Sequence, residues 1–200
     1  RDLRMSRGLG DVYKRQAEFR LPGFAYSLRV LLTPYTNGQR AKRYMGAEDA
    51  DEGLRVFLRD HWAGLANKYC DTEGVNLLVA HLFMAREGGE LPEEPEDERP
   101  INIGGADAVY TSLIPPAMQY AALGHLHRWQ TVDVEPCPAV YSGSPLSYSF
   151  SEAEQDKYVT LVDLEPGGPA RVTKRRLVSG RPLVRRRFEG VETALQWLTE

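Results

Sequence analysis

The chain has 200 residues, a formal net charge of −3, 42% apolar residues and 26% charged residues. This composition is typical of a globular domain with a sizeable core, and it excludes collagen-like and disordered chains. The longest apolar runs fall short of the roughly 20 residues that a membrane-spanning helix requires, and the N-terminus has no signal-peptide pattern, so we expect a cytoplasmic protein without membrane contact. Cys70 and Cys137 form no Cys-x-x-Cys motif, which predicts free thiols.

The N-terminal part of the chain is irregular up to residue 16 and regular beyond residue 26. Residues 1–16 have neither helical nor strand periodicity, so we interpret them as a non-native or disordered leader. The β-rich run 26–33, closed by Pro34, predicts a strand. A helix is expected over 48–70 because apolar residues recur there at three- and four-residue steps: Leu54, Phe57, Leu58, Trp62, Leu65, Ala66 and Tyr69.

Three of the four histidines follow apolar runs that predict buried strands. Residues 75–80 are followed by His81, and residues 119–123 by Gly124-His125-Leu126-His127, where the glycine permits a sharp turn. If these strands are parallel, their carboxyl ends open onto one edge of the sheet and the three imidazoles converge there. Neutral imidazoles bind zinc, manganese and iron, although a buried histidine can equally be a hydrogen-bonded core residue.

Charge is distributed unevenly along the chain. The segment 87–98 is strongly acidic and contains two prolines, which predicts a solvated loop. The segment 171–187 is strongly basic and includes Arg185, Arg186 and Arg187. Such a run fits either one edge of a phosphate-backbone footprint or the charged outer face of a strand.

The C-terminal third predicts strands followed by a helix. Residues 141–145, Tyr-Ser-Gly-Ser-Pro, are interpreted as a structural turn, because no acid–base partner for a serine nucleophile lies nearby in the sequence. Residues 158–163 and 170–178 predict a β-hairpin that extends a second sheet, so a two-sheet sandwich core is expected. Residues 181–188 are read as one more strand or a linker, and residues 191–198 begin a helix.

Several motifs resemble those of a known enzyme family. Leu78-Val-Ala-His81, followed by Ala122-Leu-Gly-His-Leu-His127, is similar to the last two metal motifs of the calcineurin-like metallophosphoesterases. The segments 97–105, 119–130 and 140–152 resemble the SbcD branch of these enzymes, and the resemblance extends over roughly residues 20–190 in the expected order.

This resemblance implies a fold and a metal site. The fold class is α/β, a partial metallophosphoesterase two-sheet sandwich with flanking helices. Residues 17–180 correspond to the C-terminal part of the nuclease domain and residues 181–200 to the start of a C-terminal cap domain. The implied cofactor is Mn²⁺ in a two-metal site, with Mg²⁺ as an alternative; His81 and His125 share one ion and His127 binds its neighbour.

The resemblance also implies a function and partners. Members of the SbcD branch are double-strand DNA exonucleases and single-strand endonucleases that process DNA ends and hairpins with an SbcC-like ATPase in DNA repair, replication and recombination. The full-length protein is expected to form a homodimer. Arg128, Arg185, Arg186 and Arg187 are candidate DNA contacts, although an exposed arginine that bridges to the sheet explains Arg128 equally well.

The sequence departs from the family pattern at its other metal motifs. Asp-x-His and Gly-Asn-His-Asp, which supply the bridging carboxylate and the histidine that assists the leaving group, do not occur in the chain. Three neutral histidines cannot hold two divalent cations close together, since nothing offsets the repulsion between the ions. We therefore expect a truncated reading frame that is inactive or nearly so alone. Alternatives are another calcineurin-like phosphodiesterase and a non-catalytic DNA- or partner-binding remnant.

Overall fold

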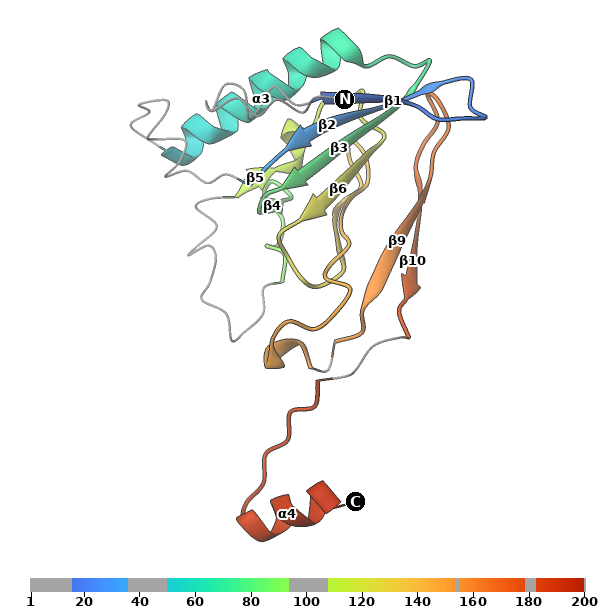
Figure 1. The fold of residues 1–200 in the computed structure, drawn as a ribbon. Helices are drawn as coiled ribbons and strands as arrows, with labels where there is room; N and C mark the ends of the chain where they lie inside the picture. Colours follow the sequence, from blue (N-terminus) through green and yellow to red (C-terminus); the bar gives the residue numbers. More distant parts are fainter. Residues whose placement is uncertain (1–15, 36–49, 94–107, 154, 179–182, 200) are drawn as a thin grey trace, which may run out of the picture.

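The computed structural model describes residues 16–35, 50–93, 108–153, 155–178 and 183–199. A six-stranded sheet with the order β1-β2-β3-β6-β8-β7 forms the centre of the fold (Figure 1). Its strands are β1 (Gln16–Arg20), β2 (Ser27–Thr33), β3 (Val75–His81), β6 (Tyr120–Gly124), β7 (Gln130–Asp133) and β8 (Ala139–Tyr141). The predicted α/β class is confirmed.

The parallel arrangement predicted for the central strands is confirmed. The pairs β2–β3, β3–β6 and β6–β8 are parallel, and Leu78 lies between Leu31 and Ala121 in the register. The helix α3 (Ala50–Tyr69) connects β2 to β3 and agrees closely with the predicted span. The carboxyl ends of β2, β3 and β6 therefore meet at one edge of the sheet.

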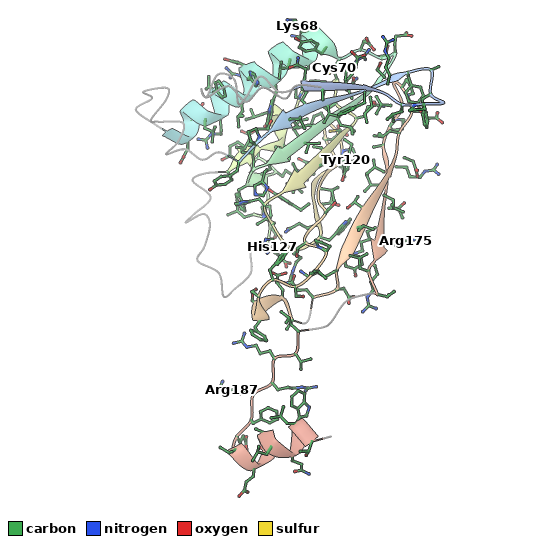
Figure 2. All side chains as sticks on the ribbon, in the orientation of Figure 1. Lys68, Cys70, Tyr120, His127, Arg175 and Arg187 are labelled. Atoms are coloured by element: carbon green, nitrogen blue, oxygen red, sulfur yellow. The ribbon has the colours of Figure 1, made fainter. Side chains whose placement is uncertain are left out.

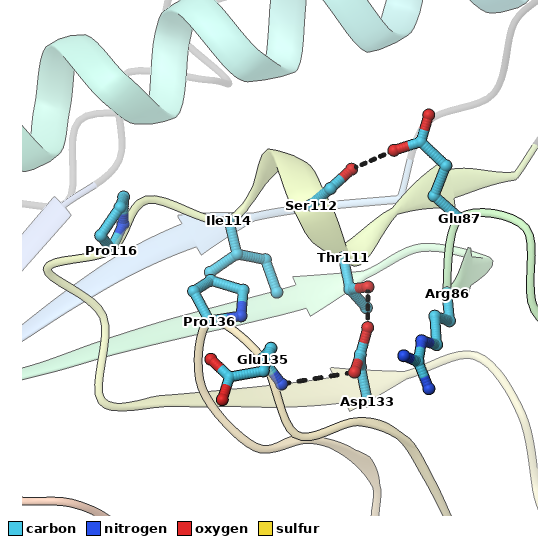
Figure 3. Close-up of a pocket in the computed structure, with 9 residues that line it drawn as sticks. All are labelled: Arg86, Glu87, Thr111, Ser112, Ile114, Pro116, Asp133, Glu135 and Pro136. Atoms are coloured by element: carbon cyan, nitrogen blue, oxygen red, sulfur yellow. Dashed lines mark hydrogen bonds between the residues drawn. The ribbon is translucent and has the colours of Figure 1, made fainter.

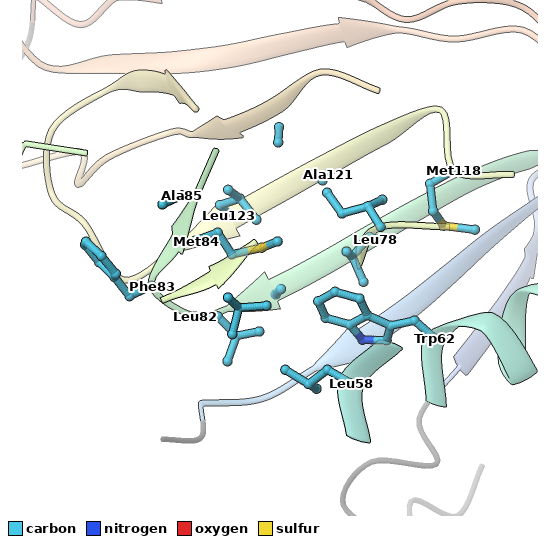
Figure 4. Close-up of a cluster of buried hydrophobic side chains, with 14 of the residues drawn as sticks. Leu58, Trp62, Leu78, Leu82, Phe83, Met84, Ala85, Met118, Ala121 and Leu123 are labelled. Atoms are coloured by element: carbon cyan, nitrogen blue, oxygen red, sulfur yellow. The ribbon is translucent and has the colours of Figure 1, made fainter. Parts of the chain in front are cut away.

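The core lies between α3 and the sheet (Figure 4). Leu54, Leu58, Trp62 and Ala66 on the predicted apolar stripe are all buried. The indole nitrogen of Trp62 also donates a 2.8 Å hydrogen bond to the hydroxyl of Thr33 at the end of β2. This contact satisfies a buried donor and fixes α3 close to the edge where the strands end.

The prediction of a structureless leader is wrong at its last residue. Gln16 begins β1 and pairs with Leu31, in an antiparallel ladder that continues to Arg20 opposite Ser27. Residues 1–15 lie outside the described residues. The strand was missed because five residues on a sheet edge carry little periodicity, and pairing with β2 decides their conformation.

The remaining elements are smaller. The predicted hairpin is confirmed as β9 (Tyr158–Asp163) and β10 (Arg171–Arg176), an antiparallel two-stranded sheet beside the main one. A second small sheet pairs β4 (Met84–Ala85) with β5 (Val109–Tyr110). Short 3-10 helices η1 (Thr111–Leu113) and η2 (Phe150–Glu152) follow β5 and β8.

The C-terminal helix α4 (Val191–Thr199) was also predicted. Residues 183–188 before it have no regular structure, so this segment is a linker rather than a strand, and α4 buries none of its side chains. Residues 94–98 of the acidic segment and Arg181 of the basic segment lie outside the described residues. Both cysteines are free thiols, as predicted. Within the described ranges, no helix is long and apolar enough to cross a membrane.

Candidate metal centre

Two of the predicted histidines meet where β3 and β6 end. His81 is the last residue of β3 and pairs in register with Gly124, so His125 follows directly beyond β6. The ring centroids of His81 and His125 are 5.3 Å apart at an interplanar angle of 78°. Tyr35, just beyond β2, stacks on His125 with a centroid distance of 5.5 Å and meets His81 edge-on. Both imidazoles therefore contact the ring of Tyr35.

The backbone at this edge is shaped by a glycine and by a strained histidine. A Cβ atom on Gly124 would lie 3.0 Å from Nδ1 of His81, so glycine is what permits the close approach of that imidazole. The sharp turn expected at Gly124 occurs one residue later, because His125 has a φ of 118°. A side-chain-bearing residue at positive φ costs free energy, and such residues are enriched at functional sites.

The environment of His125 keeps its ring neutral. Burial lowers the pKa of His125 to about 4, and the charges of His81 and His127 act in the same direction. An imidazole with this pKa is uncharged near pH 7 and retains a nitrogen lone pair for a metal ion.

The third histidine is bound to a carboxylate that the sequence analysis did not identify. Nδ1 of His127 lies 3.0 Å from Oε1 of Glu152, whose side chain is fully buried. The second carboxylate oxygen of Glu152 forms an ion pair with Lys157. Burial raises the pKa of Glu152, but the hydrogen bonds from Lys157 and His127 outweigh this effect, so the net shift is downward. Glu152 lies within the motif 140–152, yet no periodicity marks it as a buried acid.

The donor set fits part of a transition-metal site. His81 and His125 bring together two imidazoles, one of them held neutral, whereas His127 contacts Glu152 and the ring of Tyr148. In the part of the chain that the structure describes, no group of three or more His, Cys, Asp or Glu side chains could hold a metal ion. A tetrahedral or octahedral ion needs further ligands beyond these two.

The candidate DNA-binding arginines are all exposed. Arg128 directly follows His127, which is labelled in Figure 2, and forms an ion pair with Glu93. Arg185, Arg186 and Arg187 lie on the irregular segment before α4. Exposure makes these side chains accessible to a phosphate backbone, and the pairing of Arg128 agrees with the alternative that it bridges to a neighbouring segment.

A separate pocket of about 480 Å³ opens between η1 and the start of the β7–β8 connection (Figure 3). Thr111, Asp133 and Arg86 line it, and none of His81, His125 and His127 does. Asp133 accepts hydrogen bonds from the Thr111 hydroxyl at 2.6 Å and from the backbone N–H of Val134 at 2.8 Å. The Asp133 carboxylate is therefore hydrogen-bonded to neighbouring residues of the protein.

The chain is similar in sequence to known nuclease subunits. It is 43% identical over 146 residues to the SbcD component of nuclease SbcCD from Bacillus subtilis, a match that covers 72% of this chain and 36% of that protein. It is 38% identical over 128 residues to the corresponding SbcCD component from Rhodobacter capsulatus, a match that covers 64% of this chain and 31% of that protein. No protein-family model matches the chain.

The matches cover only part of each relative and agree with the observed fold. The chain spans about one third of the length of both relatives, and its mixed six-stranded sheet with flanking helices is consistent with part of a metallophosphoesterase fold. The resemblance of this chain to the SbcD nuclease subunits is therefore confirmed at the level of sequence.

Proposed function

We propose that this chain is the histidine-bearing part of a metal-dependent DNA nuclease of the SbcD type. The observation that carries the proposal is the meeting of His81 and His125 at the carboxyl ends of β3 and β6. In parallel α/β sheets, this edge is where ligands and catalytic groups gather. The sequence similarity to two SbcD proteins supports the choice of phosphodiester hydrolysis over other metal chemistry.

The three histidines would bind two neighbouring metal ions. His81 and His125 would hold one Mn²⁺ or Mg²⁺ ion through their ring nitrogens, and His127 would hold a second ion. When bound, such a pair of ions lowers the pKa of a water molecule and stabilises the attacking and leaving oxygens of the phosphodiester. Tyr35 covers the stacked face of His125 and limits access of water to that ring.

The metal assignment can be tested by titrating the purified chain with Mn²⁺ in a calorimeter. We expect binding that His81→Ala and His125→Ala each abolish. His61→Ala is the matched control, since His61 stacks on Phe57 within α3 and does not follow a strand of the sheet. Equal loss of binding in all three variants, or no effect of any, would contradict the assignment.

The partners follow from the same proposal. The complete protein acts on DNA ends and hairpins in the cytoplasm together with an SbcC-like ATPase, in repair, recombination and replication, and forms a homodimer. Double-strand exonuclease and single-strand endonuclease activities both fit a two-metal site.

The arginines at 185–187 would contact the phosphate backbone. If replacing all three with alanine leaves the salt dependence of DNA binding unchanged, the run is only a solvated face.

The 200-residue chain alone is expected to cleave DNA poorly or not at all. Its described histidines have no bridging carboxylate among them, and two divalent ions held by imidazoles alone repel each other. The measurement is a Mn²⁺-dependent cleavage assay on linear duplex DNA. Robust cleavage by this chain that His127→Ala abolishes would contradict the expectation.

A further inference from the structure

A buried network of charged and polar groups surrounds His127 on the side away from solvent. Glu152 is fully buried and contacts His127 through Oε1 and Lys157 through Oε2, at 3.0 and 2.5 Å. The Ser144 hydroxyl lies 3.2 Å from the same carboxylate. A buried carboxylate is costly unless it is paired and hydrogen-bonded, and each oxygen of Glu152 has partners.

The network also holds the backbone of His127. Its carbonyl oxygen accepts hydrogen bonds from the backbone N–H of Ser144 at 3.1 Å and from the ammonium group of Lys157 at 3.4 Å. A Cβ atom at Gly143, where φ is +74°, would lie 2.8 Å from that carbonyl. Glycine therefore lets the turn after β8 close onto His127, so both the ring and the main chain are fixed by one segment.

The pairing with Lys157 decides which atom carries the shared proton. A carboxylate beside a buried ammonium group is stabilised in its ionised form, and an ionised carboxylate only accepts hydrogen bonds. The proton between the two residues then belongs to Nδ1 of His127. An imidazole that donates from Nδ1 has its lone pair on Nε2, so it can bind a metal ion through Nε2.

We propose that Glu152 is a positioning residue that holds His127 in the Nδ1–H tautomer, which directs the lone pair of Nε2 toward a metal ion. This proposal rests on the proposed function for the role of Nε2, but the tautomer itself is a property of the chain without metal. Glu152 acts through its contact with His127, as outer carboxylates do for metal-binding histidines.

The first test is a long-range ¹H–¹⁵N NMR correlation spectrum of the histidine-labelled chain near neutral pH. The His127 signals are identified by their loss in His127→Gln. We expect Nδ1 to resonate as a protonated nitrogen and Nε2 as an unprotonated one. A protonated Nε2, or shifts averaged between both tautomers, would overturn the proposal.

The second test removes the carboxylate without leaving a buried ammonium group unpaired. The double variant Glu152→Leu with Lys157→Met should lose the Nδ1–H preference, and Glu152→Gln should weaken it, because an amide can donate as well as accept. Asp156→Asn is the control, since Asp156 pairs with Arg176 and leaves His127 untouched. An unchanged His127 tautomer in the double variant would contradict the role of Glu152.

A Mn²⁺ titration separates this proposal from the proposed function. Loss of a carboxylate behind a metal-binding histidine typically weakens metal binding about 10- to 100-fold, and we expect a rise of that size in the dissociation constant for Glu152→Gln. A wild-type chain with the Nδ1–H tautomer but no Mn²⁺ binding would contradict the proposed function while supporting the positioning role of Glu152.

Discussion

At the scale of single residues, His125 combines a strained backbone with a half-buried ring. Its φ of 118° lies where side-chain-bearing residues are rarely found, and its ring is packed between Tyr35 and His81. Strain of this kind persists when a side chain must be held in one place. The free-energy cost of the strained backbone at His125 should therefore be measurable separately from the metal-binding role of its imidazole.

Two substitutions at His125 distinguish the backbone strain from the role of the imidazole. Both His125→Ala and His125→Gly remove the imidazole, but only glycine tolerates positive φ. We expect the glycine variant to be more stable than the alanine variant by about 1 kcal/mol in urea denaturation, and both to lose Mn²⁺ binding. Equal stability of the two variants would show that the backbone at this residue is unstrained.

Gly124 provides a second test at the residue scale. In Gly124→Ala, the new methyl group would meet the imidazole of His81 at 3.0 Å, and this exposed ring can move aside. We expect weaker Mn²⁺ binding with little loss of thermal stability. Gly64→Ala is the control: Gly64 is exposed within α3 and nothing lies near its missing Cβ, so stability should rise by roughly 0.5–1 kcal/mol.

At the scale of elements, the attachment of α3 to β2 depends on one buried polar contact. Thr33→Val preserves shape but leaves the indole N–H of Trp62 without its acceptor. The expected loss is about 1–3 kcal/mol in the free energy of unfolding. In a Trp62→Phe background, which has no donor, the same substitution should cost about 1 kcal/mol less. Additive losses in this double-mutant cycle would show that the hydrogen bond contributes nothing.

The end of β7 carries a pH-dependent contribution to stability. Burial raises the pKa of Asp133, but hydrogen bonds from Thr111 and from the backbone of Val134 and Glu135 outweigh it, so the folded pKa lies below its usual value. The contribution is complete above the unfolded-state pKa of about 3.9 and disappears as pH falls through the lower folded value.

The prediction concerns Asp133→Asn. The wild type should be more stable than this variant at neutral pH, and the difference should shrink as the solution is acidified below about pH 4. Urea denaturation across this range measures it, with Asp163→Asn on β9 as a control for the loss of one exposed charge. A difference that stays constant with pH would show that Asp133 is not stabilised in its ionised form.

The sequence predicted the elements with strong periodicity and missed those that depend on tertiary contacts. The stripe from Leu54 to Ala66 and the apolar runs before His81 and Gly124 carry periods that burial requires, and α3, β3 and β6 followed them. β1 is an edge strand whose pairing partner decides its conformation. Glu152 was missed because burial of a carboxylate depends on Lys157 and His127, which only the folded chain brings together.

At the scale of the whole molecule, the fold places His81, His125 and His127 at the end of one sheet from segments far apart in the sequence. The topology that does so, three parallel strands with a helical crossover, was predictable, and so was the proximity of His81 to His125. The contact of His127 with Glu152 was not. The central claim is that these three histidines form one metal-binding edge.

Paramagnetic broadening by Mn²⁺ tests this claim most directly. Histidine ring resonances of the chain are followed while substoichiometric Mn²⁺ is added. The account predicts that His81, His125 and His127 broaden first and together, whereas His61 on α3 remains sharp. Broadening of His61 to the same extent, or no selective broadening of the other three, would contradict it.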